Sequence, residues 1–195
     1  MVSGQANSAE LPPHLRAILD DLEKADQQGR RIAAGLSDAQ ANWRPGETGW
    51  SVAQCLDHLA RANTVYAAAL HKAVKEARSN RPGLGPIQPG WFGRLVIRSF
   101  EPPPTRKLRA PRKIVPGSQI SSQEALQAFL RSHEDVRTVI RDGARVDLNR
   151  IRFRNPFIRF LRFTVGTGLL IIAAHDRRHL WQAEKVLECS GFPKS

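Results

Sequence analysis

Four stretches of this chain repeat apolar residues at intervals of three and four, the period of an amphipathic α-helix. In the third stretch, for example, Leu126, Phe129, Val136 and Ile140 share one helical face. We expect four helices, at about 15–36, 51–78, 121–143 and 167–189. Such helices must bury their apolar stripes against one another, so the sequence predicts an all-α fold, a four-helix bundle.

Segments rich in proline and glycine separate the predicted helices. Ser51 and Gln54 have the spacing of a capping box at the start of the second helix, and Ser121 and Glu124 have it at the third. The segment 79–121 cannot continue a helix, apart from a short one near Trp91 to Ser99. So long a connection predicts one long crossover between helices two and three. The second link, ARVDLNRIRFRNPFIRF at 144–160, is expected to be irregular and is compatible with a short extended stretch.

Length and composition are those of an ordinary single domain, with 195 residues of which 41% are hydrophobic. We expect residues 1–13 to be a flexible N-terminal tail and 14–195 to be one bundle domain. The first residues lack the pattern of a secretion signal, and the uncharged apolar run 163–174 is shorter than the roughly 20 residues of a membrane helix. Two cysteines, Cys55 and Cys189, fit a reducing compartment. These features predict a cytoplasmic protein with no membrane partner.

Basic residues give the chain a formal net charge of +12 and gather in two clusters. Residues 94–113 contain many arginines and lysines but only the acid Glu101, and residues 150–162 contain arginines and no acid. The simplest interpretation is a solvated basic surface. Such surfaces also attract nucleic acid, anionic membranes and acidic ligands without sequence preference.

Two histidines, His175 and His179, lie four residues apart in the last predicted helix. At 100° per residue they point about 40° apart, on the arc that also holds Ile172, Gln182 and Val186. Buried imidazoles need hydrogen-bond partners or a metal ion. An i, i+4 pair is a good chelate for one ion, and the alternative is a pair bonded to neighbours or water.

A tight metal site needs a third ligand from another helix. His58 is the best candidate, because it lies at the shoulder of the apolar arc of the second helix. His133 competes with it from the apolar stripe of the third helix, where it would complete the shell, orient a ligand, or bond a carbonyl in the core. Gln182 is placed to support His179 or a bound water. Cys55, one turn before His58, is a further candidate ligand or redox thiol, although buried cysteines usually only pack.

Two blocks of the sequence resemble the DinB-like family. They are GWSVAQCLDHLARA at 49–62 and AAHDRRHLWQAEKV at 173–186, and RKLRAPRKIVPGS at 106–118 resembles the approach to the third helix in many relatives. The resemblance implies a four-helix bundle with a long crossover. It also implies that His58, His175 and His179 bind a divalent metal, with zinc or nickel as the usual ion.

Some members of that family are thiol-dependent transferases or isomerases, in which the metal activates a low-molecular-weight thiol such as bacillithiol or mycothiol. The resemblance therefore implies a metal-dependent enzyme that activates a thiol or water against a small electrophile. Basic residues at the pocket mouth would hold carboxylates of such a cofactor; the candidates are Arg178, Arg159 and Arg162. Asp57 and Asp176 adjoin the predicted ligands and would support them, or are plain surface charges.

Two other functions stay open from the sequence. One is a metal-binding protein without turnover, and the other is a nucleic-acid-associated stress protein, suggested by the basic clusters and by the family's link to DNA damage. No recognised nucleic-acid motif supports direct reading of bases. A homodimer is a further expectation, since bundles of this family often pair.

Overall fold

The protein is described here by a computed structural model that covers residues 11–77, 81–83, 85–104 and 109–194. Residues 1–10 of the predicted tail lie outside the described residues. Leu11 is buried, with 5% of its surface exposed, and the first helix begins at Pro13. Packing of the bundle therefore starts a few residues before the expected boundary at residue 14.

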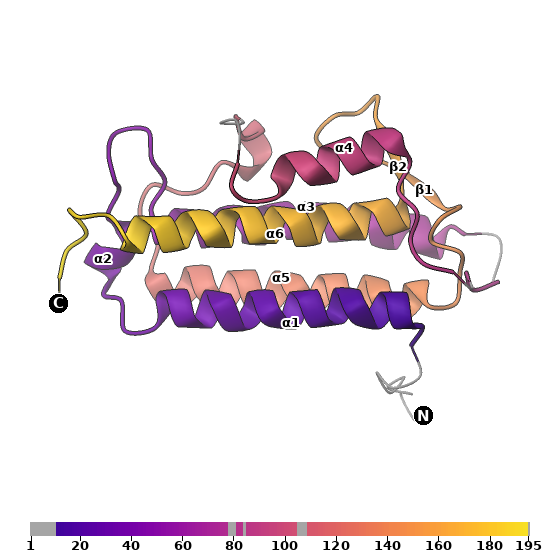
Figure 1. Cartoon of the computed structure of the whole chain (residues 1–195), viewed down its shortest axis with the longest axis horizontal. Helices are drawn as coiled ribbons and strands as arrows, with labels where there is room; N and C mark the ends of the chain where they lie inside the picture. The colour runs from indigo at the N-terminus through magenta and orange to yellow at the C-terminus, as the bar shows by residue number, and fades with distance from the viewer. Residues whose placement is uncertain (1–10, 78–80, 84, 105–108, 195) are drawn as a thin grey trace.

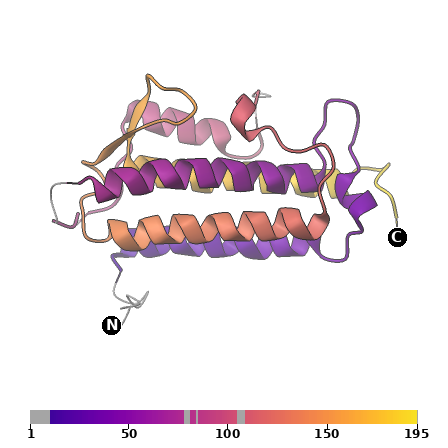
Figure 2. The same ribbon diagram turned by 180° about the vertical axis from the view of Figure 1, so that it is seen from behind.

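Four long helices form the bundle, as the apolar periods predict: α1 (Pro13–Ala33), α3 (Val52–Lys75), α5 (Ser122–Gly143) and α6 (Val165–Leu187). Helices α1 and α5 form one layer, and α3 and α6 form the other (Figures 1 and 2). Helices α3 and α5 run in the same direction, opposite to α1 and α6 (Figure 1). The long connection between α3 and α5 therefore returns along the whole bundle, which confirms the predicted crossover.

Local capping explains where several helices begin. Ser51 and Gln54 form the predicted capping box of α3, with both hydrogen bonds present. A second box, between Ser37 and Gln40, starts the short helix α2 (Asp38–Asn42) inside the segment expected to be a plain connection. The box expected at Ser121 is not formed; instead the backbone N–H of Ser122 donates to Asp38 Oδ1 at 2.8 Å. The start of α5 is thus capped from α2 rather than from its own first turn.

The crossover and the last link add a second tier on the α3–α6 layer. The crossover contains α4 (Trp91–Phe100) and the 3₁₀ turn η2 (Arg112–Ile114). The last link forms a hairpin of β1 (Arg152–Arg154) and β2 (Arg162–Thr164), which pair antiparallel with Phe153 opposite Phe163. Helix α4 and the hairpin lie on the same side of the bundle, away from α1 and α5 (Figures 1 and 2).

Buried polar residues divide the apolar core of the bundle into two parts. One part is built around Leu22, Leu70 and Leu169, and the other around Leu56 and Leu180. Between them, each long helix contributes one buried polar side chain to a layer across the bundle; these are Asp26, Asn63, His133 and Asp176. No helix in the described part of the chain has the length and apolar character needed to cross a membrane.

Candidate metal centre

Three histidines from two helices meet in the α3–α6 layer. His58 Nε2 lies 3.2 Å from His175 Nε2, and the ring centroids of His58 and His179 are 4.5 Å apart. One ring nitrogen from each of the three histidines lies within 4.8 Å of the other two. His58 and His179 are buried and His175 is half-buried. The pair that the helical period placed on one arc therefore does meet the histidine of the second long helix.

Hydrogen bonds to the Nδ1 atoms of His58 and His179 fix the orientation and the tautomer of these two rings. His58 Nδ1 donates to the carbonyl oxygen of Ile114 at 2.7 Å, and His179 Nδ1 donates to Gln182 Oε1 at 3.0 Å. In a neutral imidazole whose Nδ1 carries the proton, Nε2 keeps its lone pair. His58 and His179 therefore both offer an unprotonated Nε2, which is the atom a metal ion needs.

Burial favours the neutral form of all three imidazoles. Desolvation lowers the pKa of His58, although the Ile114 carbonyl and the charge of Asp57 oppose it. Desolvation lowers the pKa of His175 and of His179 well below the ordinary value, and His58 and Arg178 lower both further. The proximity of His179 also lowers the pKa of His175, whereas the hydrogen bond with Gln182 opposes the shift of His179. Neutral imidazoles are the ligating form, so the cluster is ready to bind a cation near neutral pH.

The donor set fits a divalent ion. Two nitrogens that each lie about 2.0–2.1 Å from zinc in a tetrahedral shell are about 3.3 Å apart, close to the 3.2 Å between His58 and His175 Nε2. Three imidazoles leave further coordination positions for small ligands, as in catalytic zinc sites. Imidazole nitrogen also suits nickel and copper, so the donors do not select one metal.

Aromatic rings pack against each histidine of the cluster. The Trp50 ring lies 4.6 Å from the ring of His58 and is stacked at 5.4 Å on that of His179. The Phe100 ring, from α4, meets the ring of His175 edge to face at 5.1 Å. Trp50 directly precedes the Ser51 cap of α3, so the same turn that starts the helix also covers the histidines.

A cavity of about 1020 Å³ opens beside the histidines. Its histidine end also carries Gln182 and Arg178, and most of its remaining wall is apolar. Two elements of the second tier contribute to that wall: Val96 and Phe100 belong to α4, whereas Phe157 and Leu161 belong to the hairpin loop. This volume is at the upper end of those that hold drug-sized ligands.

The three arginines predicted to bind substrate differ in whether they line the cavity. Arg178 lines the cavity with 6% of its surface exposed, and its Nη1 donates to the carbonyl of Ser99 at 3.1 Å. Arg159 and Arg162 do not line the cavity; both are exposed on the hairpin. The period-2 alternation of a strand turns Arg162 outward because its neighbour Phe163 is buried.

Cys55 and Asp57 lie near His58 in sequence but not at the cluster. Cys55 is fully buried in the apolar core, and desolvation raises the pKa of its thiol. Asp57 Oδ2 accepts from Arg61 Nε at 2.7 Å and from the Gly117 N–H at 3.0 Å. It anchors the segment that follows η2, and through it the Ile114 carbonyl that holds His58.

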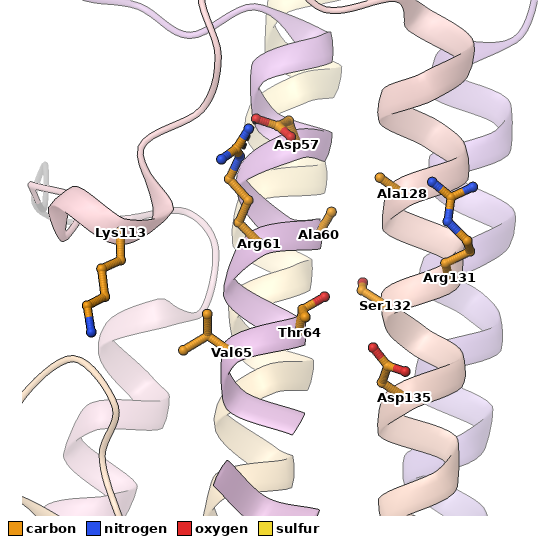
Figure 3. A pocket seen from close by; sticks show the side chains of 10 residues that line it. All are labelled: Asp57, Ala60, Arg61, Thr64, Val65, Lys113, Ala128, Arg131, Ser132 and Asp135. Atoms are coloured by element: carbon orange, nitrogen blue, oxygen red, sulfur yellow. Dashed lines mark hydrogen bonds and ion pairs between the residues drawn. The ribbon is translucent and has the colours of Figure 1, made fainter. Parts of the chain in front are cut away.

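Asp57 also lines a second hollow, of about 620 Å³, between α3 and α5 (Figure 3). Arg61 lines it from α3 and Arg131 and Asp135 line it from α5, and Lys113 lines it from η2 (Figure 3). No histidine lines this hollow. We place the candidate chemistry in the larger cavity, where the three imidazoles are.

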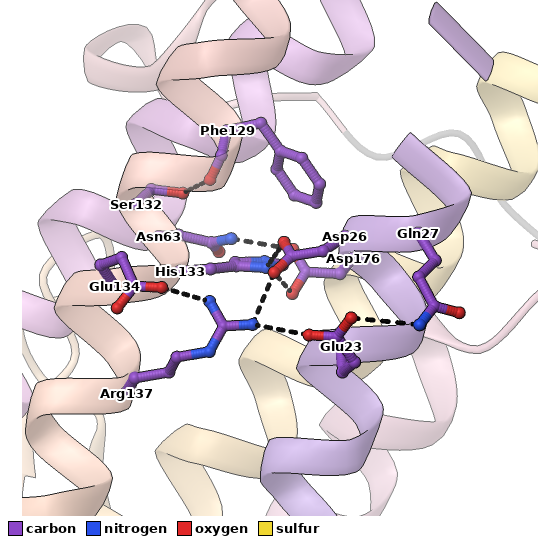
Figure 4. Close-up of polar contacts among 10 residues, drawn as sticks. All are labelled: Glu23, Asp26, Gln27, Asn63, Phe129, Ser132, His133, Glu134, Arg137 and Asp176. Carbon is purple, nitrogen blue, oxygen red and sulfur yellow. Dashed lines mark hydrogen bonds and ion pairs between the residues drawn. The ribbon is translucent and has the colours of Figure 1, made fainter. Parts of the chain in front are cut away.

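His133 and Asp176 belong to the polar layer rather than to the cavity. His133 Nδ1 lies 2.6 Å from Asp26 Oδ1, and its Nε2 lies 3.2 Å from Asp176 Oδ2 (Figure 4). Asp176 also accepts from Asn63 Nδ2 at 2.9 Å, and Arg137 donates to Asp26 (Figure 4). Both nitrogens of His133 are thus engaged by carboxylates, so His133 is a core residue held by hydrogen bonds and not a third ligand.

Sequence reasoning did not find several residues of the site. Trp50 was not among the predicted site residues, and the Ile114 carbonyl comes from a turn that no side-chain pattern predicts. In the cavity wall, Asn155 Nδ2 donates to the Tyr66 hydroxyl at 2.6 Å, a contact across 89 positions of sequence. The apolar stripe of α3 was the only signal for Tyr66, and it did not reveal this partner.

A helical bundle with an inward three-histidine cluster beside a large cavity defines a class of candidate metal-binding proteins. Comparison with known proteins places the chain more narrowly. Residues 21–183 match the family model of the DinB superfamily, so the chain belongs to that superfamily. It is also similar to "Uncharacterized protein YuaE" of Bacillus subtilis (strain 168), with 26% identity over 155 residues, 79% of this chain and 87% of the relative. No solved structure matches significantly.

Proposed function

We propose that this protein is a divalent-metal-dependent enzyme that activates a low-molecular-weight thiol or water against a small electrophile. His58, His175 and His179 would hold the ion, with zinc or nickel as the expected metal. The observation that supports this most is the pair of unprotonated Nε2 atoms that His58 and His179 direct into a cluster at the edge of a large cavity.

The bound ion would supply Lewis acidity, which lowers the pKa of a thiol or water beside it. Residues of the chain would hold the ligand rings in place and shield the cluster. Ile114 and Gln182 hold the outer nitrogens of two ligands, so those rings need little rearrangement on binding. Trp50 and Phe100 place apolar rings against the cluster, which reduces its contact with water.

The cavity supports a substrate with an apolar body and an anionic group. Arg178 is the cavity arginine nearest in sequence to the ligands, and a guanidinium binds carboxylates in bidentate geometry. It would hold a carboxylate of the thiol cofactor or of the substrate. Arg159 and Arg162 are not part of this proposal, because they do not line the cavity.

The first experiment measures metal content. Purified protein is analysed by mass spectrometry of its elements after dialysis against zinc or nickel, and compared with His58→Ala and His175→Ala. We expect about one ion per chain in the parent and a clear loss in both variants. His71→Ala is the matched control, because His71 lies on the same helix as His58 but pairs with Asp142. Equal metal content in all four proteins would refute the ligand assignment.

The second experiment measures turnover. The metal-loaded protein is incubated with a panel of low-molecular-weight thiols and electrophiles, and loss of free thiol is followed. We expect consumption that falls at least about 100-fold in His58→Ala, as for loss of a catalytic metal. Metal binding without turnover across the panel would favour the non-catalytic alternative. Salt-sensitive retention on DNA with a slope of several units would favour the nucleic-acid alternative.

A further inference from the structure

The outward face of α4 combines exposed apolar residues with arginines. Trp91, Arg94, Leu95 and Arg98 fall within an arc of about 100° on this helix. Trp91 is 74% exposed and Leu95 56%, whereas Gly93 on the inner side is buried against Thr167 of α6. This helix therefore has two apolar sides, one packed on the bundle and one facing outward.

The hairpin loop presents a second apolar projection. Phe160 is 85% exposed and Ile158 43%. The loop is nevertheless well held: Asn155 Oδ1 accepts the backbone N–H groups of Phe157 and Ile158, each at 2.9 Å, and the Leu161 N–H bonds the Ile158 carbonyl. Because these hydrogen bonds hold the loop backbone in place, the loop conformation itself keeps Phe160 exposed.

Arginines surround these apolar side chains without acidic partners. Arg152, Arg154 and Arg162 are exposed on the outer face of the hairpin, since Phe153 and Phe163 point inward. No arginine of α4 or of the hairpin forms an ion pair within the described residues. Glu101, the acid that follows α4, is engaged by Arg177 at 2.6 Å.

The two elements form one surface. The ring of Phe92, on the first turn of α4, is stacked parallel on Phe163 of β2 at 5.9 Å. Both views show α4 and the hairpin side by side on the outside of the α3–α6 layer (Figures 1 and 2). We call the outward side chains of residues 91–98 and 152–162 the α4–hairpin face.

We propose that the α4–hairpin face docks on an anionic phospholipid bilayer. Trp, Leu, Phe and Ile are the side chains that enter the boundary between headgroups and acyl chains, and arginines around them contact lipid phosphates. Charge complementarity selects the partner, because the face holds many arginines and no free acid. The short apolar run of the sequence predicted no membrane partner, but it speaks only to spanning segments, and an interfacial face needs none.

Other occupants fit this face less well. Leu95 and Ile158 have no ring to stack on a nucleic-acid base, which is the main apolar contact in single-strand binding. A second copy of the chain, docked symmetrically, would bring the same arginines against one another. A bilayer accepts aliphatic and aromatic side chains alike and supplies the missing negative charge.

The test is vesicle binding by the full chain. Protein is sedimented with sucrose-loaded vesicles of phosphatidylcholine alone, or with 30% phosphatidylglycerol, at about 0.1 M salt. We expect binding to anionic vesicles at least about tenfold stronger than to neutral ones. Double substitution Trp91→Ser with Leu95→Ser should reduce it at least about tenfold, as should Arg94→Gln with Arg98→Gln. Both pairs are exposed, so folding should survive, and circular dichroism checks this.

The control removes the same charge elsewhere. Arg30→Gln with Arg31→Gln lies on α1, on the opposite side of the bundle, and should leave binding within about twofold. Brominated lipids in the anionic vesicles should quench fluorescence in the parent but much less in Trp91→Phe. The proposal is overturned if the α1 pair reduces binding equally, if no quenching occurs, or if vesicles do not bind. It is equally overturned if the Trp91/Leu95 variant instead loses oligonucleotide binding or a dimer seen by light scattering. Because the assay needs no metal or turnover, its outcome is separate from that of the proposed enzyme.

Discussion

His175 and Asp176 are neighbours in the chain but face two different interiors. His175 Nε2 meets His58 Nε2 at 3.2 Å in the histidine cluster, whereas Asp176 Oδ2 lies 3.2 Å from His133 Nε2 in the polar layer. One residue of α-helix turns the side chain by about 100°, which is enough to separate them. The same turn of α6 therefore sets the position of the cluster and is itself held by a buried ionic network.

Removing His133 should destabilise the fold strongly. His133→Ala leaves Asp176 buried with Asn63 but no cation, while Asp26 keeps Arg137, and breaking a buried pair in this way costs about 3–5 kcal/mol. The free energy of unfolding is measured by urea denaturation. His71→Ala is the control, because its ion pair with Asp142 is partly exposed and should matter by less than about 1 kcal/mol. Similar losses in both variants would contradict the role assigned to the polar layer.

Stability should fall as the pH rises above neutrality. Burial alone lowers the pKa of His133, but the charges of Asp176 and Asp26 and their hydrogen bonds outweigh it and raise the pKa to about 9. An unfolded histidine titrates near 6.5. Stabilisation from His133 is therefore complete below about pH 6.5 and is lost as the pH rises through 9.

Urea denaturation at several values between pH 7 and 9.5 measures this loss, which we expect to be on the order of 2–3 kcal/mol. The clustered histidines do not produce it, because their pKa values are lowered and they are neutral throughout this range. His133→Gln should give a nearly flat profile. An equally steep profile in that variant would assign the titration to another group.

Gln182→Ala should weaken metal binding without removing it. The side-chain oxygen of Gln182 holds the His179 ring through Nδ1 at 3.0 Å, and loss of such a partner typically costs about 10–100-fold in metal affinity. Competition with a chelator measures the affinity. Gln27→Ala, at an exposed glutamine on α1 that bonds Glu23, should leave the affinity unchanged. An unchanged affinity in Gln182→Ala would mean that His179 needs no such support.

Trp50 should report metal binding by its fluorescence. Its ring lies 4.6 Å from that of His58 and 5.4 Å from that of His179, so paramagnetic Ni²⁺ held by the cluster would quench it. We expect most of the nickel-dependent quenching of the parent to vanish in Trp50→Phe. Trp43→Phe should keep the quenching, because Trp43 packs against Phe192 near the end of the chain. Quenching that survives in Trp50→Phe would place the ion elsewhere.

Gly168→Ala should be destabilising although alanine favours helices by about 1 kcal/mol. A Cβ at this position of α6 would lie 2.6 Å from Leu70 Cδ2 and 2.8 Å from Phe153 Cε1, both buried. Overpacking of this kind costs about 1–3 kcal/mol. Thermal unfolding is the measurement, with Gly85→Ala as the control because no atom lies within 4 Å of a Cβ there. A higher melting temperature in Gly168→Ala would show that β1 can move away.

The apolar periods were sufficient to predict the four long helices, because each stripe must face a common core. They also placed His175 and His179 on one arc and His58 at the shoulder of another, and the resemblance to the family implied that the three bind one metal. The helical wheel gave the direction of each residue around its own helix, but not which neighbouring helix it meets. For that reason His133 stayed a competitor of His58 until the packing of α5 was known.

The contacts that shape the cavity could not be predicted, because they depend on how irregular segments return to the bundle. The Ile114 carbonyl reaches His58 from 56 positions away, through a three-residue turn with no side-chain signature. The outward direction of Arg162 depends on the register of a strand of only three residues. Short elements of this kind carry too little pattern to fix their register from sequence.

Ile158 lines the cavity and is also 43% exposed on the outer surface of the hairpin. At this point a single thickness of polypeptide separates the molecule's interior from its surroundings. A mutation of Ile158 changes the cavity wall and the outer surface together. The ligand that the cavity accepts and the partner that the outer surface contacts therefore cannot evolve independently at this position.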